Sequence, residues 1–346
     1  MTNRSASTKF RAVARWRGSL SRCLVLCSLE LGICWSAHAA TFTTFDVPGV
    51  RGSLVQSISP AGEITGSYVD ESFVVHGFLR ARDGTLTTFA APGANFTKAV
   101  SINPAGAITG SYVDGSFLSH GFLRGPDGTF ATVDVPGANF TTAVSINPAG
   151  AITGSYVDAS FVLHGFLRRP DGTFATVDVP GANFTTAVSI NLAGAITGSY
   201  VDASFVLHGF LRKPDGTFTT FDVPGAVHTY PVSINPAGAI TGYYPDASYA
   251  FHGFLRARDG TFTTFDVPGA VHTYPASINP AGAITGSYMD GSFVVHGFLR
   301  APDGTLTTFD VPGAIHTYPA SINPAGVITG SYVDASVVLH GFLRSP

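Results

Sequence analysis

Apolar and polar residues alternate over short segments along most of the chain. Residues 93–136 illustrate the pattern, with segments at 97–103, 107–114, 117–124 and 129–136 separated by turns that include Asn-Pro-Ala-Gly and Gly-Pro-Asp-Gly. The segments are rich in β-branched and aromatic residues, and no helical period extends over ten residues. Proline placed early and glycine placed late favour tight turns. The pattern predicts an all-β protein.

The same order of segments recurs at a fixed step of 44 residues. HGFLR, for example, begins at His76, His120, His164, His208, His252, His296 and His340. Seven full units of 44 residues would take 308 residues, and 41–346 supplies 306, so there is no room for a second domain. Four short strands per unit are typical of a propeller blade, in which each sheet covers its neighbours. We predict a single domain over 41–346, a seven-bladed β-propeller with four strands per 44-residue blade.

Both ends of the repeat array bear on whether the propeller closes. The phrase TFTTFDVPG at 41–49 is the last strand of a unit, whereas the final unit stops after three strands at HGFLR, 340–344. Pairing of these segments would complete the seventh blade and cover exposed strand edges. We therefore predict that the N-terminal strand closes the last blade. The alternative is a linear β-solenoid, since each unit contains two similar hairpins, but a solenoid needs atypical capping repeats.

Residues 1–40 have the features of a secretory signal peptide. A basic stretch from Arg4 to Arg22 precedes the apolar CLVLCSLELGICW, and Ala37-His38-Ala39 fits a cleavage site. Cleavage would remove all three cysteines, and with them any disulfide or thiolate metal site. The remaining 13 basic and 21 acidic residues give a formal charge of −8, which disfavours nucleic acid as a partner. We expect a secreted monomer, extracellular or periplasmic, without a membrane span.

The pattern SINPAGAITGSYVD, followed by HGFLR and DGT, resembles the HAF-type extracellular repeat of bacteria. That family usually has His-Ala-Phe-Leu-Trp at its core. Here glycine replaces the alanine, as at Gly121, and arginine replaces the tryptophan, as at Arg124, in all seven units. The resemblance covers 41–346 and implies export and a propeller-like fold, without a defined activity.

The residue types that support catalysis lie at repeated positions. One histidine per unit indicates a structural role, and we expect each HGFLR histidine to tie strands together within its unit. All 19 aspartates occupy repeat positions, and Glu63 and Glu71 are the only glutamates after residue 40. A glycosidase needs two carboxylates in different environments, and no known catalytic motif is present. We expect no enzyme activity, no cofactor and no metal site.

Function is better sought where the units differ. The connection between units reads GVRGSLVQS once, Gly-Ala-Asn-Phe-Thr three times, and Ala-Val-His-Thr-Tyr-Pro or Ala-Ile-His-Thr-Tyr-Pro three times. Tyrosine and imidazole suit sugar or peptide recognition, although each segment could simply shape its own loop. The candidate ligand-binding residues, expected side by side on one arc, are His228, Tyr230, His272, Tyr274, His316 and Tyr318.

These features predict an exported, non-enzymatic module that binds or scaffolds a glycan, a surface polymer or a protein. Unit 129–172 and unit 173–216 differ at only two positions, which suits a distributed binding surface better than an active site. Two alternatives remain. One is a lyase or hydrolase acting on polysaccharides, with a His/Tyr site at the central mouth. The other is a spacer without a ligand.

Overall fold

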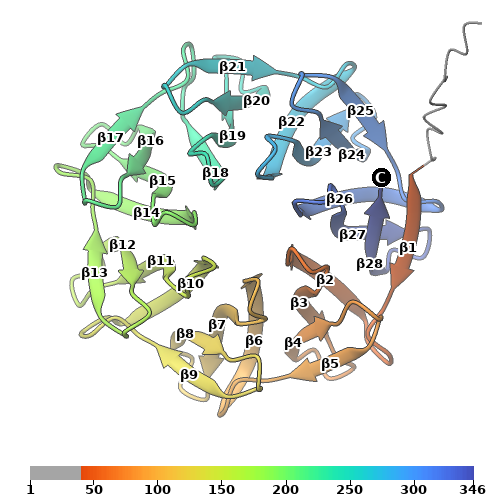
Figure 1. The fold of residues 1–346 in the computed structure, drawn as a ribbon, viewed down its shortest axis with the longest axis horizontal. Helices are drawn as coiled ribbons and strands as arrows, with labels where there is room; N and C mark the ends of the chain where they lie inside the picture. Colours follow the sequence, from red (N-terminus) through yellow and green to blue (C-terminus); the bar gives the residue numbers. More distant parts are fainter. Residues whose placement is uncertain (1–39) are drawn as a thin grey trace, which may run out of the picture. The chain divides into compact units, whose positions relative to one another are not determined.

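The computed structural model describes residues 40–346 and contains 28 strands in that range. The predicted signal peptide lies outside the described residues except for Ala40. Successive strands form antiparallel sets of four around a central opening, and in each set the first strand lies nearest the opening (Figure 1). The all-β prediction is confirmed.

The innermost strands are β2 (Gly52–Ile58), β6 (Ala94–Ile102), β10 (Phe140–Ile146), β14 (Phe184–Ile190), β18 (Tyr230–Ile234), β22 (Ala270–Ile278) and β26 (Ala314–Ile322). The second strands are β3 (Ile64–Val69), β7 (Ile108–Asp114), β11 (Ile152–Val157), β15 (Ile196–Val201), β19 (Ile240–Pro245), β23 (Ile284–Asp290) and β27 (Ile328–Asp334). The third strands are β4 (Val75–Arg80), β8 (Ser119–Arg124), β12 (Leu163–Arg168), β16 (Leu207–Arg212), β20 (Phe251–Arg256), β24 (Val295–Arg300) and β28 (Leu339–Ser345). The outermost strands are β5 (Leu86–Phe89), β9 (Phe130–Val133), β13 (Phe174–Val177), β17 (Phe218–Phe221), β21 (Phe262–Phe265), β25 (Leu306–Phe309) and β1 (Thr41–Phe45).

The N-terminal strand β1 pairs with the C-terminal strand β28. The antiparallel register runs from Thr41 opposite Ser345 to Phe45 opposite Gly341. Five of the sheets contain four strands each, and the sixth contains eight, because a single parallel bridge from Gly52 to Leu339 links β2 to β28. The first and last segments of the repeat array are therefore joined by hydrogen bonds.

One turn geometry joins the strands within every set. In the turn from β10 to β11, Asn147 N–H donates to Ala151 O and Gly150 N–H donates to Asn147 O. Gly150 has a φ of 84°, a left-handed conformation that only glycine adopts without a steric penalty. The turn from β12 to β13 repeats the pattern, with Gly172 at 89°. The glycines late in both predicted turns thus occupy the conformation that requires them.

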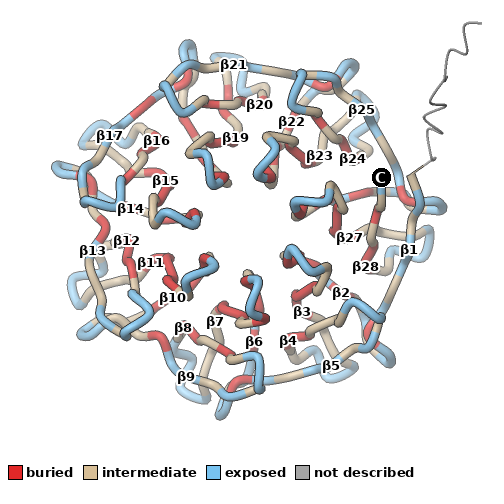
Figure 2. Tube along the Cα trace, viewed as in Figure 1, coloured by how far each residue is buried: buried red, intermediate tan, exposed pale blue. Residues whose placement is uncertain are grey.

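The core lies between neighbouring sets. Phe166 of HGFLR and Ile152 of β11 are almost fully buried, as are their equivalents in the other sets. Figure 2 shows buried residues along the strands and exposed residues in the turns. Gly165 has no room for a larger side chain, because a Cβ there would lie 2.6 Å from Val177 O. Packing therefore accounts for glycine at the position where HAF-type repeats usually have alanine.

Polar contacts also join successive sets. Asn147 Nδ2 donates to Asn191 O at 3.1 Å, and the same bond links Asn103 to Asn147 and Asn191 to Asn235. The guanidinium of Arg124 lies 4.8 Å from the ring centre of Phe89 in the preceding set. Arginine, like tryptophan, stacks well on aromatic rings, which gives the HGFLR arginine a packing role in the five sets where it meets a phenylalanine.

Candidate functional site

The three predicted histidines make one and the same contact. Nδ1 of His228, His272 and His316 accepts a hydrogen bond from the backbone N–H of Leu207, Phe251 and Val295 at 3.2, 3.1 and 3.1 Å. Each histidine therefore accepts a hydrogen bond from the third strand of the preceding set. His272 and His316 lie in innermost strands, and His228 lies just before one. This contact fixes the ring and fulfils a structural role.

Two of the three predicted tyrosines meet in one aromatic cluster. Tyr230 stacks on Tyr243 at 5.0 Å between ring centres, and Tyr274 lies 5.5 Å from Tyr243 and 5.4 Å from Phe251. Burial raises the pKa of Tyr243, and the neighbouring Tyr230 and Tyr274 add to this. Tyr243 and Phe251 occupy positions held by serine and by aliphatic or serine residues in the other units. The cluster is thus specific to the junction of β18–β21 with β22–β25.

The third pair lies outside this cluster. Tyr318 is 38% exposed, and His316, at 6.1 Å, is its aromatic neighbour among the described residues. In the set that precedes Tyr318, Ser287 and Val295 occupy the positions that Tyr243 and Phe251 occupy in the set before Tyr274. The sequence placed all three pairs side by side on one arc, whereas the aromatic contacts join only the first two.

The HGFLR histidines link strands within each set, as predicted. Nδ1 of His120 lies 2.7 Å from Asp134, after the outermost strand, and Nε2 lies 3.4 Å from Asp114, at the end of the second strand. His120 also stacks on Tyr112 at 5.0 Å. Burial alone would lower the pKa of His120, but the hydrogen bonds and charges of the two aspartates outweigh it and raise the pKa.

One set lacks the second aspartate. His76 contacts Asp70 at 2.9 Å through Nε2, but Ala90 stands where the other units have the aspartate of Asp-Val-Pro-Gly. In the last set this aspartate is Asp46, which follows β1 and lies 2.9 Å from Nδ1 of His340. The His-to-Asp contacts thus also connect the N-terminal segment to the final set.

The carboxylates are engaged in local structure. The Tyr-x-Asp aspartates, such as Asp158, accept the backbone N–H groups of the turn that follows. Glu63 and Glu71 lie at opposite ends of β3, roughly 20 Å apart at the rise of an extended strand. A glycosidase pair lies within about 5–10 Å. Within residues 40–346 no group of three or more His, Cys, Asp or Glu side chains is placed to hold a metal ion.

A more exposed feature, which the sequence reading did not identify as a site, lies in the turns between the second and third strands. These turns have the same hydrogen bonds as the two glycine turns; for example, Phe161 N–H donates to Asp158 O. The left-handed position is nevertheless taken by a large side chain, with φ between 61° and 64° and 63–78% exposure. These residues are Phe73, Phe117, Phe161, Phe205, Tyr249, Phe293 and Val337.

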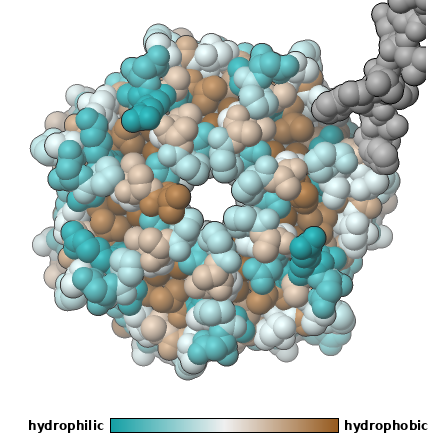
Figure 3. Space-filling model, in the orientation of Figure 1, coloured by the Kyte–Doolittle hydropathy of each residue, from teal (hydrophilic) through white to brown (hydrophobic). Residues whose placement is uncertain are grey.

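These turns lie at the same end of the strands as the connections between units. In an antiparallel set of four, the second-to-third turn and the connection after the fourth strand share one end. The contact of Arg51, in such a connection, with the ring of Phe73 at 4.1 Å agrees with this. We call the seven side chains the turn ring. Figure 3 shows one face of the molecule, with its central opening and with hydrophobic surface in the recesses between the sets.

The fold is similar to that of solved β-propellers. The β-propeller domain of the Trilobed protease from Pyrococcus furiosus, with an open velcro topology, gives a TM-score of 0.59 at 9% identity, covering 84% of this chain and 95% of that one. A puromycin-hydrolyzing peptidase from Mycobacterium tuberculosis gives 0.58 at 12%, covering 85% and 53%. An ancestral GH74 enzyme gives 0.51 at 10%, covering 88% and 51%. The described chain therefore has a β-propeller fold.

This likeness concerns the fold alone, because the identities are low. The chain spans about half the length of the peptidase and GH74 chains that it matches. No family model matches the chain, and no curated protein matches its sequence. Among residues 40–346 there is no helix with the length and apolar character that a membrane crossing requires.

Proposed function

We propose that this protein is an exported, non-enzymatic, seven-bladed β-propeller that binds a neutral polysaccharide through the turn ring. The observation that carries the proposal is the conformation of the ring residues. A bulky residue at positive φ costs on the order of 1–3 kcal/mol, and such strain persists where it serves a function. The same turn is made with glycine twice more in six of the units and once more in the last, so the fold itself does not require phenylalanine there.

Exposure supports a ligand rather than a packing role. Phe161 and its equivalents leave most of their surface in water, so burial offsets little of the strain. Flat aromatic faces exposed around one end of a fold are typical of binding surfaces.

The near-identity of the units favours a repetitive ligand. Units 129–172 and 173–216 present Phe161 and Phe205 in identical turns, so each can bind only the same chemical group. Several weak, equal sites gain affinity when one polymer occupies more than one of them. The formal charge of −8 after residue 40 disfavours a polyanion. These features together favour a neutral polysaccharide.

Closure and export complete the proposal. The pairing of β1 with β28 and the contact of Asp46 with His340 support a seventh blade completed by the N-terminal strand. The basic and apolar segments of residues 1–40 and the resemblance to HAF-type repeats support export. The engagement of the aspartates in turns and histidine contacts supports a binding module rather than an enzyme.

Affinity electrophoresis tests the proposal, with hydroxyethylcellulose, xylan and laminarin in the gels. We expect retardation by at least one polymer and no release of reducing sugar. A variant with Phe117, Phe161 and Phe205 changed to Asn, which tolerates positive φ, should remain folded and lose most of the retardation. Leu192→Pro is the matched control: it removes an exposed apolar side chain from a first-to-second turn, at the other end of the strands, and restores the proline of the other units. Equal retardation of the Asn variant and the parent would refute the role of the turn ring.

A further inference from the structure

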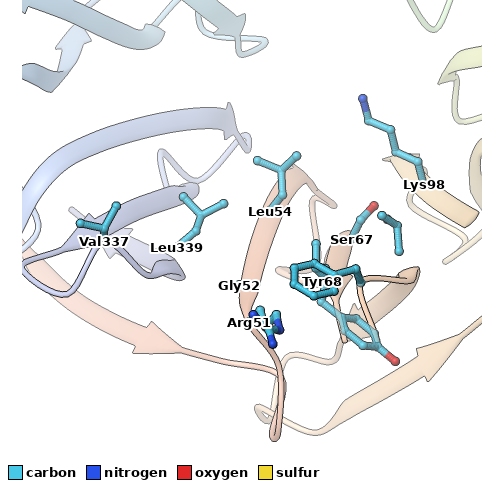
Figure 4. Close-up of a pocket in the computed structure, with 11 residues that line it drawn as sticks. Arg51, Gly52, Leu54, Ser67, Tyr68, Lys98, Val337 and Leu339 are labelled. Atoms are coloured by element: carbon cyan, nitrogen blue, oxygen red, sulfur yellow. The ribbon is translucent and has the colours of Figure 1, made fainter. Parts of the chain in front are cut away.

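An apolar cleft lies where the first and last sets meet. Its volume is about 510 Å³, within the range of small-ligand sites. The cleft crosses the innermost strand β2, with Val337 and Leu339 on one side of Leu54 and Ser67 and Lys98 on the other (Figure 4). It therefore involves three successive sets, and its walls are mainly apolar, with aliphatic and aromatic side chains.

The cleft depends on a glycine found at this position in the first unit alone. Gly52 lines it, whereas the equivalent residues in the other six units are Phe96, Phe140, Phe184, His228, His272 and His316. Without a side chain, Gly52 lets β2 approach β28, since a Cβ at Gly52 would lie 3.3 Å from that of Leu339. The volume that an aromatic ring occupies elsewhere is thus left open.

The charges around the cleft are positive. Arg51 and Lys98 both line it. The other units have Asn, Val or Ile at the position of Arg51, and Leu, Thr or Tyr at the position of Lys98. The Arg51 guanidinium rests on Phe73, which holds it in place. No carboxylate lines the cleft, and the nearby Asp70 is engaged by the N–H groups of Ser72 and Val74.

A buried polar group also lies in the wall. Ser67 is 4% exposed, and its hydroxyl has no hydrogen-bond partner within residues 40–346. The equivalent Ser331 hydroxyl accepts the N–H of Val55 and donates to Ser53 O. The Ser155 hydroxyl, at the equivalent position of the third unit, also lacks a partner, so the unpaired Ser67 hydroxyl is not specific to this cleft.

We propose that this cleft binds one small amphipathic anion, an alkyl or aryl carboxylate. Its apolar body lies against Leu54, Val337 and Leu339. Its carboxylate pairs with Arg51, whose planar fork suits two parallel hydrogen bonds, and Lys98 adds positive potential. The site shares Phe73 and Val337 with the turn ring but is distinct from the ring residues Phe117, Phe161 and Phe205. Its specificity comes from Arg51, Gly52 and Lys98, which no other unit has at these positions.

Isothermal titration calorimetry of the full-length chain tests the proposal, with decanoate as the probe. Decyl maltoside and decyltrimethylammonium serve as uncharged and cationic comparisons. We expect one decanoate per chain and no binding of the cation. Gly52→Phe, which places in the cleft the residue of the next three units, should weaken binding by at least about tenfold. Arg51→Asn should have a similar effect, and Arg82→Ala, which removes a cation outside the cleft, should have none.

Three results would overturn the proposal. They are equal binding of all three amphiphiles, several equivalent sites per chain, and unchanged affinity in Gly52→Phe. If Gly52→Phe fails to fold, the double variant Arg51→Asn, Lys98→Thr decides the matter, because both replacements occur at these positions in other units. The variant Phe117→Asn, Phe161→Asn, Phe205→Asn should bind decanoate normally, so failure of polysaccharide binding and failure of this proposal are distinguishable.

Discussion

The strain in the turn ring predicts an unusual order of stabilities at Phe161. Glycine normally destabilises a protein relative to alanine, by about 0.5–1 kcal/mol. At the φ of 62° observed for Phe161, an L-residue carries a penalty of about 1–2 kcal/mol that glycine avoids. We therefore expect Phe161→Gly to be more stable than Phe161→Ala, by up to about 1 kcal/mol.

The phenylalanine ring contributes little to oppose this. Phe161 is 73% exposed, so about a quarter of its surface is buried. At roughly 25 cal/mol per Å², burial of about 50 Å² stabilises by about 1 kcal/mol. Phe161→Ala loses this term and keeps the strain, whereas Phe161→Gly loses the same term and relieves the strain. The glycine variant should thus lie within about 1 kcal/mol of the parent protein.

Urea unfolding followed by circular dichroism measures the difference. Ala159→Gly, in the same turn but without a positive φ, provides the matched control and should destabilise by about 0.5–1 kcal/mol. The control gives the loss of stability that glycine causes relative to alanine at an ordinary φ. If Phe161→Gly is less stable than Phe161→Ala by that same amount, the reasoning is refuted. In that case position 161 would not hold a left-handed residue in solution.

Four further predictions concern the histidines, closure and the tyrosines. His164→Ala, which loses contacts to two aspartates, should lower the melting temperature by a few degrees and by more than His76→Ala, which loses one; equal losses would contradict the role of the second aspartate. Deletion of 41–48 should expose the edge of β28, lower stability strongly and cause association in size-exclusion chromatography, and a monomer with the parent's melting temperature would exclude closure. His120, His252, His296 and His340 have raised pKa values, so their protonated forms contribute stability that is fully present below the ordinary histidine pKa. The free energy of unfolding should therefore fall as pH rises through the raised pKa values, and His340→Gln should make this fall with pH smaller. Tyr274→Ala, which removes contacts to Tyr243 and Phe251, should lower the melting temperature more than Tyr318→Ala, whose ring is exposed, and the reverse order would show that the aromatic cluster does not stabilise the fold.

The sequence predicts the strands and two of the three hairpin turns, because glycine and proline there carry a direct conformational signal. It errs at the ends of segments. The segment 129–136 is a strand only over Phe130–Val133, since Asp134 turns to His120 and Pro136 has no N–H for a ladder. Register and closure depend on contacts between residues far apart in the chain, which a local pattern only suggests.

The turn ring was missed for a physical reason. The segment 117–124 begins with Phe117, and an aromatic residue before alternating residues favours a strand. In the structure, the Asp114 side chain accepts the N–H groups of Ser116 and Leu118 and holds Phe117 in the turn, so that β8 begins at Ser119. Turn chemistry outweighs β-propensity here. The sequence did contain a signal for this turn. Ser-Phe follows Tyr-x-Asp in five units, and the fifth and last units have Ser-Tyr and Ser-Val at the same place.

The distribution of differences among the units separates two kinds of recognition. Units that share Phe161 and Phe205 in identical turns can offer only repeated, equivalent contacts, which suit a repetitive polymer. A site for a single small molecule requires residues that occur once. The first unit supplies several of these, because Arg51, Gly52 and Ala90 depart from all six other units. This unit lies at the junction with the last set, where the bridge from Gly52 to Leu339 stands in the place of the hydrogen bonds that His228, His272 and His316 accept in their own units. The junction of the first and last sets is therefore also where the proposed carboxylate site lies.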